Sequence, residues 1–469
     1  MLRGAAGVVM LTGAALAQRP TLSENVKGYV RIDAPVVALS NVRVIDGTGA
    51  EPREQQTLVI RDGVIAEVGD ASRVTAPTGA DSLDLGGRTI IPGLVMVHEH
   101  FFYPTGPGVY GQLGESFTRL YLAGGVTTIR TGGNLNGYMD LNLKRAIESG
   151  QKAGPAIDAT APYVNGPSNF QQMTAVNSAD EAREHVAYWS KQGATSFKAY
   201  MQITRAALGA AIDEAHKRGL KVTGHLCSVT YAEAADLGID NLEHGFMAAT
   251  DFVADKKPDT CPGASQRQQA LMTTDERSAP FTSLVRKLID KRVALTSTLT
   301  VFETNIPGRP QPPGLEVLTV QLREQFDQAR DRAAKANDPY SAKRFAKAMA
   351  LEHAFARSGG MLIAGTDPTG AGGVIPGFSN QRQLELLVEA GFSPLEAITI
   401  GTLNGARYLD REKSIGTIAV GKQADLVVLN GNPAASIADV RKVEIVFRRG
   451  VGYDPAKLIA SVSGRVGLF

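Results

Sequence analysis

The chain lacks an excess of charge of either sign. Its 469 residues include 49 lysines and arginines against 47 aspartates and glutamates. No basic stripe with interleaved aromatic residues is present, although a nucleic-acid groove needs such a stripe. The charge balance therefore argues against a nucleic acid or another polyanion as a partner.

Cysteines and long apolar runs are also scarce. Cys227 and Cys261 are the only cysteines in the sequence. They can form one disulfide if the protein is exported to an oxidising compartment, or they can remain two buried thiols, and the sequence does not decide between these alternatives. After the first twenty residues no stretch is apolar enough to cross a bilayer, so no membrane span is predicted.

The N-terminus has the pattern of a secretory signal. Arg3 precedes an apolar run that ends in the small-residue pattern Ala-Leu-Ala at Ala17. The run is too short to remain in a membrane as a permanent helix. We therefore predict a signal peptide at residues 1–17, cleaved after Ala17, and a secreted or periplasmic mature protein that begins at Gln18.

Length and composition indicate two globular domains. The chain is longer than one hydrophobic core usually organises, and 43% apolar with 20% charged residues is typical of a folded protein. Residues 18–88 read as short alternating strands with Asp-Gly turns, and the same character returns in residues 411–469. Neither end has enough strands to bury a face alone, so we predict that both ends share one small β-sandwich domain.

Strands and helices alternate between these ends, in residues 89–410. Eight apolar segments bounded by Gly, Pro or polar turns are strand candidates: TIIPGLVMV, VTTIRTGG, AIDATAP, TSFKAYM, KVTGHL, NLEHGF, VALTSTLT and MLIAGTD. Helical segments such as DEAREHVAYWSKQG follow most of them. This alternation predicts an α/β fold with a (β/α)8 TIM barrel, whose active face the long stretches 247–293 and 302–339 are expected to cover.

Metal-competent residues follow several of these strands. His98 and His100 come directly after the first strand, and residues two apart in an extended segment point the same way, so both imidazoles can face one metal ion. Further candidates at strand ends are Lys198, His225, His244 and Asp367. Barrel enzymes build their sites at the carboxyl ends of their strands. The sequence therefore predicts one site formed by these six residues.

With these motifs the chain resembles the amidohydrolase superfamily, and most closely its imidazolonepropionase-like and prolidase-like secreted members. The matching runs are GRTIIPGLVMVHEH, FKAY, GH, EHG, GTDP and the tail GTIAVGKQADLVVL. The resemblance implies two divalent metal ions. Residues matching His98 and His100 hold the first ion, those matching His225 and His244 hold the second, and a carboxylated lysine matching Lys198 bridges both. It implies zinc, although such ligands also accept manganese, cobalt or iron.

The resemblance also implies the chemistry. The residue matching Asp367 binds the first ion and acts as the proton shuttle: it takes a proton from a metal-bridging water as the hydroxide attacks, and delivers it to the leaving nitrogen. The expected reaction is hydrolysis of an amide bond in a dipeptide, an Xaa-Pro substrate or an N-acyl amino acid. Arg130, through its fork of donors, Tyr200, on the same strand face as Lys198, and Tyr163 are the expected substrate contacts.

Two departures from the superfamily pattern bear on these expectations. Met96 stands where many members carry an Asp before the first ligand pair, so a supporting hydrogen bond is expected to be missing. Ser228 stands where deaminases usually carry a Glu that acts as acid and base. Together with Lys198, Ser228 argues against a single-metal deaminase or imidazolonepropionase.

Other functions remain open. The same two-metal site can act on a lactone, a cyclic amide or a phosphotriester, because its hydroxide attacks any sufficiently electrophilic centre, and a mononuclear deaminase or imidazolonepropionase-like enzyme is the further alternative. A binding or scaffold protein without catalysis is disfavoured because all six ligand positions are filled. The expected partner is a small-molecule substrate, and the resemblance allows a homo-oligomer.

Overall fold

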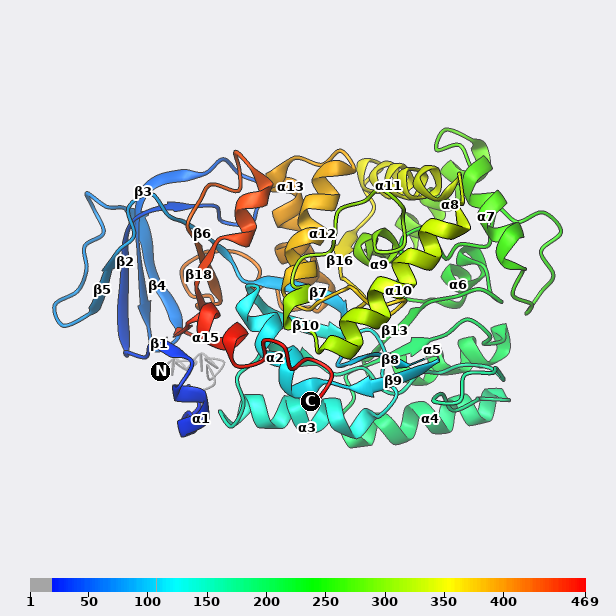
Figure 1. Ribbon diagram of the computed structural model, residues 1–469, viewed down its shortest axis with the longest axis horizontal. Helices are drawn as coiled ribbons and strands as arrows, with labels where there is room; N and C mark the ends of the chain where they lie inside the picture. The colour runs from blue at the N-terminus through cyan, green and yellow to red at the C-terminus, as the bar shows by residue number, and fades with distance from the viewer. Residues whose placement is uncertain (1–18, 107) are drawn as a thin grey trace, which may run out of the picture.

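The computed structural model describes residues 19–106 and 108–469 (Figure 1). The predicted signal peptide at residues 1–17, with its cleavage after Ala17, lies outside these residues. None of the described helices has the length and apolar character that a membrane crossing requires.

Both ends of the chain build one mixed β-sheet, at the left of Figure 1. Its strands are β1 (Val30–Ile32), β2 (Val36–Val44), β3 (Arg53–Arg61), β4 (Val64–Asp70), β5 (Asp81–Asp84), β6 (Thr89–Pro92), β17 (Leu426–Leu429), β18 (Val443–Arg448) and β19 (Val451–Tyr453). They lie in the order β1-β19-β18-β17-β6-β2-β3-β4, and β5 pairs with β2. The antiparallel pair β6–β17 joins the N-terminal and C-terminal parts.

Hydrogen bonds link all nine strands into one mixed sheet. One apolar cluster is shared by the two parts of the sheet. It contains Leu39 of β2, Ile60 of β3, Val428 of β17 and Phe447 of β18, all fully buried or nearly so. The sharing of a sheet and a core by the two chain ends is therefore confirmed.

The eight strands predicted for the central region are all present, and each pairs in parallel with its neighbours. They are β7 (Leu94–Glu99), β10 (Val126–Thr131), β11 (Ala156–Asp158), β12 (Ser196–Ala199), β13 (Lys221–Gly224), β14 (Asn241–Glu243), β15 (Ala294–Ser297) and β16 (Leu362–Ala364). They form a three-stranded sheet, β11-β10-β7, and a five-stranded sheet, β12-β13-β14-β15-β16.

The first predicted strand, TIIPGLVMV, is two strands in the structure. Its first half is β6 of the terminal sheet and its second half is β7. Gly93 separates them. Its N–H donates to the Asp425 carbonyl at 2.8 Å, and a Cβ at this position would collide with the side chain of Thr127. The boundary between the two sheets therefore lies at a glycine that the surrounding packing requires.

The two parallel sheets contact each other on both sides. Thr160, just beyond β11, forms a parallel bridge with Ser196 of β12. On the other side the N–H groups of Thr366 and Asp367, just beyond β16, donate to the His98 carbonyl at 3.1 and 3.0 Å. The carboxyl ends of the first and the last strand therefore meet.

Helices follow the parallel strands as the sequence predicts. They are α2 (Gly114–Ala123), α3 (Gly137–Glu148), α4 (Ala179–Gln192), α5 (Arg205–His216), α6 (Tyr231–Leu237), α8 (Ala279–Asp290), α11 (Ser341–Arg357) and α12 (Phe378–Glu389). The ends of α4 show the local cause: the Ser178 side chain accepts a hydrogen bond from the Glu181 N–H, and Gly193 ends the helix with a φ of 104°.

The two long stretches contain further helices. Residues 247–293 include α7 (Ala264–Thr273) as well as α8, and residues 302–339 include the end of α9 (Leu299–Glu303) and α10 (Val320–Ala336). In Figure 1 α7 and α8 lie at the end of the molecule opposite the terminal sheet. Cys227 and Cys261 form a disulfide, with 4.8 Å between their Cα atoms, and it joins the segment after β13 to the loop before α7.

Candidate metal centre

Three predicted ligands, His98, His100 and Asp367, form a compact cluster. One ligand atom from each lies within 4.8 Å of the others, and all three side chains are buried. The His100 Nε2 atom lies 3.1 Å from Asp367 Oδ1, and His98 Nε2 lies 3.8 Å from the same oxygen. Two imidazoles and a carboxylate in this arrangement are a donor set that suits zinc and similar divalent ions.

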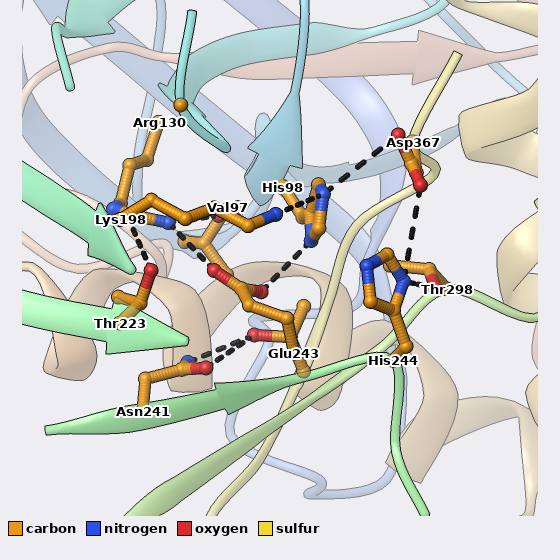
Figure 2. A network of polar contacts seen from close by, with 12 residues as sticks. Val97, His98, Arg130, Lys198, Thr223, Asn241, Glu243, His244, Thr298 and Asp367 are labelled. Atoms are coloured by element: carbon orange, nitrogen blue, oxygen red, sulfur yellow. Dashed lines mark hydrogen bonds and ion pairs between the residues drawn. The ribbon is translucent and has the colours of Figure 1, made fainter. Parts of the chain in front are cut away.

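Second partners orient both imidazoles. The His98 Nδ1 atom contacts Glu243 Oε2 at 2.8 Å (Figure 2), and His100 Nδ1 contacts the Gly133 carbonyl at 3.0 Å. Each ring therefore holds its Nδ1 proton on an acceptor and presents the lone pair of Nε2 toward Asp367. This arrangement of a ligand histidine and an outer acceptor is the usual one around protein-bound metal ions.

The other three predicted residues border the same cluster. Lys198 Nζ lies 3.0 Å from His98 Nε2, and His244 Nδ1 lies 3.8 Å from Asp367 Oδ2. The ring centroids of His225 and His244 are 4.3 Å apart. The structure thus brings together all six residues that the strand-end argument singled out.

Two of these residues have a positive φ, a backbone conformation that residues other than glycine rarely adopt. His244 has a φ of 69° and Asp367 a φ of 55°. Both lie just beyond a strand, β14 and β16 respectively. Left-handed backbone of this kind costs about 1–3 kcal/mol and concentrates at functional sites. Here the turn at each strand end directs the side chain toward the other members of the cluster.

Burial sets the protonation states of the cluster. It lowers the pKa of His100 to about 4 and that of His225 to about 3, so both imidazoles are neutral at pH 7. Burial alone would raise the pKa of Asp367, but the surrounding imidazoles, His98 first among them, hold it well below its usual range. Neutral imidazole and ionised carboxylate are the forms that bind metal ions.

The Lys198 side chain is buried, and nearby carboxylates offset only part of the cost of burying its charge. Burial lowers the pKa of its ammonium to about 8, although Glu243 and Asp367 raise it in part. No carboxylate of the described residues makes an ion pair with Lys198. A buried lysine without a direct acidic partner is costly as a cation, so the neutral amine is accessible near pH 8.

Arg130, an expected substrate contact, is buried inside the protein. Its guanidinium is 1% exposed and donates four hydrogen bonds within the protein. It donates to the Val97 carbonyl at 3.0 Å and to Glu243 Oε1 at 3.2 Å. Two hydroxyls, those of Ser196 and Thr223, accept the other two bonds. The expected contact between Arg130 and a substrate carboxylate is therefore wrong, because the buried guanidinium is held by these partners and Arg130 does not line the cavity above the cluster.

Glu243 is the functional residue that the sequence argument missed. It lies in the quoted NLEHGF segment, directly before His244, and is fully buried between Arg130 and His98. A carboxylate within an apolar strand needs a buried partner, and this was the available signal. Glu243, from another strand, supplies a hydrogen bond to His98, whereas Met96 is a buried core residue.

A cavity of about 290 Å³ opens above the cluster. Tyr163 and Tyr200 line it, as do His100, Lys198 and Asp367. Further lining comes from aromatic and aliphatic side chains, which include Phe102, Tyr110, Leu135, Phe170, Met173 and Phe302. Ser228 is directed away, since its hydroxyl donates to the Ile203 carbonyl. The cavity is therefore apolar around a polar, metal-competent floor.

Comparisons with known proteins agree with this geometry. The Amidohydrolase family model matches residues 89–451. An imidazolonepropionase from Nocardia farcinica is 34% identical over 142 residues, and the match covers 29% of this chain but only 34% of that relative. A candidate prolidase from Bifidobacterium longum is 26% identical, with a TM-score of 0.65 over 91% of this chain and 98% of the other.

A second solved structure shows the same fold at lower identity. It is a Xaa-Pro dipeptidase with methionine bound in its active site, 20% identical, with a TM-score of 0.67 over 89% of this chain and all of the other. At this identity the likeness concerns the fold alone. The family model, by contrast, spans most of the chain and includes all six residues of the cluster. The chain therefore belongs to the amidohydrolase family.

Proposed function

We propose that this protein is a binuclear metal-dependent amidohydrolase that cleaves an amide bond in a dipeptide, an Xaa-Pro substrate or an N-acyl amino acid. The observation that carries the proposal is the convergence of six side chains from five strand ends at one cavity, which all of them except His98 line. Four imidazoles, a carboxylate and a buried lysine are more than one tetrahedral ion needs.

The residues fit a metal pair by their donor chemistry. His98 and His100 keep the lone pair of Nε2 for a ligand because the proton of each ring is held at Nδ1 by an outer acceptor. His225 and His244 line the same cavity as Lys198 and Asp367. We assign His98, His100 and Asp367 to one ion, His225 and His244 to the second, and zinc as the metal.

Lys198 is proposed to bridge the ions as a carbamate. The neutral amine adds carbon dioxide at Nζ and loses a proton, which yields an anionic group with two oxygen donors. The lowered pKa of this buried lysine supplies the neutral amine that the addition requires. The carbamate also removes the cost of an unpaired buried cation.

When bound, the ions would polarise the substrate carbonyl and lower the pKa of a water molecule. Asp367 is held ionised at the cavity floor, so its carboxylate can take a proton from the attacking water and pass it to the leaving nitrogen. Burial raises the pKa of the Tyr200 phenol, which therefore stays a hydrogen-bond donor, and we propose that it binds the carbonyl oxygen. Tyr163 is the second proposed donor in the cavity.

The proposal extends to the whole chain. The two parallel sheets, in contact on both sides, are proposed to close as one (β/α)8 barrel over residues 89–410. Residues 18–88 and 411–469 are proposed to form the second domain, a small β-sandwich. The signal-like residues 1–17 are proposed to direct secretion or export to the periplasm.

Metal content and hydrolysis, measured together, test the proposal. Two equivalents of zinc per chain and hydrolysis of members of a dipeptide and N-acyl amino acid panel are expected, with both reduced in Lys198→Ala. Lys191→Ala, which changes an exposed lysine of α4, is the control. One equivalent of metal, unchanged in Lys198→Ala, would overturn the bridged pair and favour a mononuclear, deaminase-like enzyme. Lactones and phosphotriesters in the same panel test the other open reactions.

A further inference from the structure

A second cavity adjoins the one above the metal-competent cluster. This distal cavity measures about 440 Å³, and Phe302 lines both spaces. The ring centroids of Phe302 and His244 are 5.9 Å apart. Phe302 therefore borders both the distal cavity and the cluster.

The walls of the distal cavity are mainly apolar. Met247, Leu271, Ile306 and Phe345 line it together with Phe302. Leu271 belongs to α7 and Phe345 to α11, and Met247 and Ile306 lie in the two long stretches. The predicted covering elements thus enclose a space of their own, suited to an apolar part of a ligand.

Two guanidinium groups also line this cavity, and they differ in their partners. Arg344 forms an ion pair with Asp338. Arg267, on α7, has no side-chain hydrogen bond or ion pair with any described residue, and its Nε is buried without a partner. A partly desolvated guanidinium without an acceptor is costly, so Arg267 is available for an anion.

The cavity above the cluster offers no such group. Arg130 is buried, is held by Glu243 and the Val97 carbonyl, and does not line this cavity, and Lys198 belongs to the metal-competent cluster itself. The remaining described lining residues there are imidazoles, phenols, the Asp367 carboxylate, Thr369 and apolar groups. Among the described side chains of the two cavities, Arg267 is therefore the free cation for a substrate carboxylate.

The position of α7 relative to the cluster is covalently constrained. Cys261 precedes α7 by three residues, and its disulfide partner Cys227 follows His225 by two. The helix that carries Arg267 is thus tied to the strand end that carries a proposed metal ligand. This tether limits how far the start of α7 can move from that strand end.

We propose that the distal cavity is a substrate subsite for an apolar group that ends in a carboxylate, and that Arg267 binds this carboxylate. The inference rests on the proposed function and narrows it. Because Arg267 lines the distal cavity and not the cavity above the cluster, the preferred amides carry their carboxylate at the far end of an apolar spacer. A carboxylate next to the scissile nitrogen would not reach Arg267.

Equilibrium binding tests the subsite without any hydrolysis. We would titrate the zinc-loaded protein with 6-phenylhexanoate and with 6-phenylhexanamide in a calorimeter. The acid is expected to bind about 10-fold more tightly than the amide, as a charge-assisted contact allows. Arg267→Met should abolish the difference. Arg286→Met, which removes an exposed charge on α8, should retain it. A preference for the acid that persists in Arg267→Met would overturn the proposal, because the metal ions would then bind the carboxylate.

Hydrolysis then tests the spacing. The substrates are N-benzoyl amino acids with one, three or five methylenes between the scissile nitrogen and the carboxylate. Each acid is compared with a matched compound in which a primary carboxamide replaces the carboxylate. We expect kcat/KM to favour the acid over the carboxamide by about 10-fold at the longer spacings only, and this preference to disappear in Arg267→Met. A preference confined to the one-methylene pair would overturn the inference. If no member is hydrolysed but Arg267-dependent binding persists, the proposed function fails and the subsite stands.

Discussion

His98 Nδ1 and Glu243 Oε2 lie 2.8 Å apart, and neither side chain reaches solvent. The second oxygen of the same carboxylate accepts a hydrogen bond from Arg130 at 3.2 Å. These contacts join three strands, because His98 belongs to β7, Arg130 to β10 and Glu243 to β14. The orientation of one proposed metal ligand thus depends on an ion pair that lies outside the cavity.

Glu243→Gln should weaken metal binding. Gln is neutral and cannot hold the His98 Nδ1 proton as strongly, so the direction and basicity of Nε2 both change. Changes of this kind cost roughly 10- to 100-fold in metal affinity, which a chelator competition assay measures.

Glu352→Gln is the matched control for this substitution. Glu352 is also buried, and burial raises its pKa to about 8, so it is already neutral at pH 7. Its replacement should leave metal affinity unchanged. Equal losses in the two variants would contradict the positioning role of Glu243.

Arg130→Met should lower the stability of the fold. It leaves the buried Glu243 carboxylate without its cationic partner and removes a donor from the Val97 carbonyl. The expected loss is about 3–5 kcal/mol in the free energy of unfolding, measured by urea denaturation. Unchanged stability combined with a raised KM for carboxylate substrates alone would restore the substrate contact that the sequence suggested.

Removal of the disulfide should also destabilise the protein. The bond closes a loop with a sequence separation of 34 residues. In the chain-entropy model such a loop contributes about 3–4 kcal/mol. The double substitution Cys227→Ala and Cys261→Ala should show this loss by denaturation, and a reductant should lower the stability of the wild type but not that of the double variant. A wild type that does not respond to complete reduction would contradict this expectation.

Asp140 should make stability depend on pH. Burial raises the pKa of its carboxyl to about 7 in the folded protein, although Asn134 donates a hydrogen bond to it at 3.3 Å. The folded state therefore binds the proton more tightly than the unfolded chain, whose pKa is near 3.8. Stability from this group is present below about pH 4 and is lost as the pH rises to about 7.

Asp140→Asn separates the contribution of Asp140 to the pH dependence of stability from that of the other titratable groups. The amide keeps an acceptor for Asn134 and never ionises. We expect the variant to be more stable than the wild type by on the order of 2–4 kcal/mol at pH 8, with a difference near zero at pH 4, in urea denaturation at both values. A difference that is the same at both pH values would show that ionisation of Asp140 is not the cause.

Local patterns in the sequence predicted much of the fold. The eight parallel strands were recognisable as short apolar segments between turn residues, and α4 as a periodic segment between Ser178 and Gly193. These features depend on residues close together in the chain. The six residues of the cluster were also predictable, because each lies at the end of such a strand and parallel strands bring their carboxyl ends to one side.

The direction of individual side chains was not predictable in this way. Arg130 and Glu243 lie on strands whose residues are buried on both faces, so alternation along the strand does not distinguish the cavity from the packed interior. Their contact joins residues 113 positions apart.

The sequence by itself determined the alternation of strands and helices, the sharing of a sheet by the two chain ends, and the residue types at the strand ends. Only the tertiary structure decided that Gly93 divides the first strand, that Arg130 supports Glu243 below the cavity, and that Cys227 and Cys261 pair. It alone also placed Arg267 beside a second cavity. The physical reason is that secondary structure follows from interactions over a few neighbouring residues, whereas burial, ion pairing and cavity shape follow from packing between distant segments.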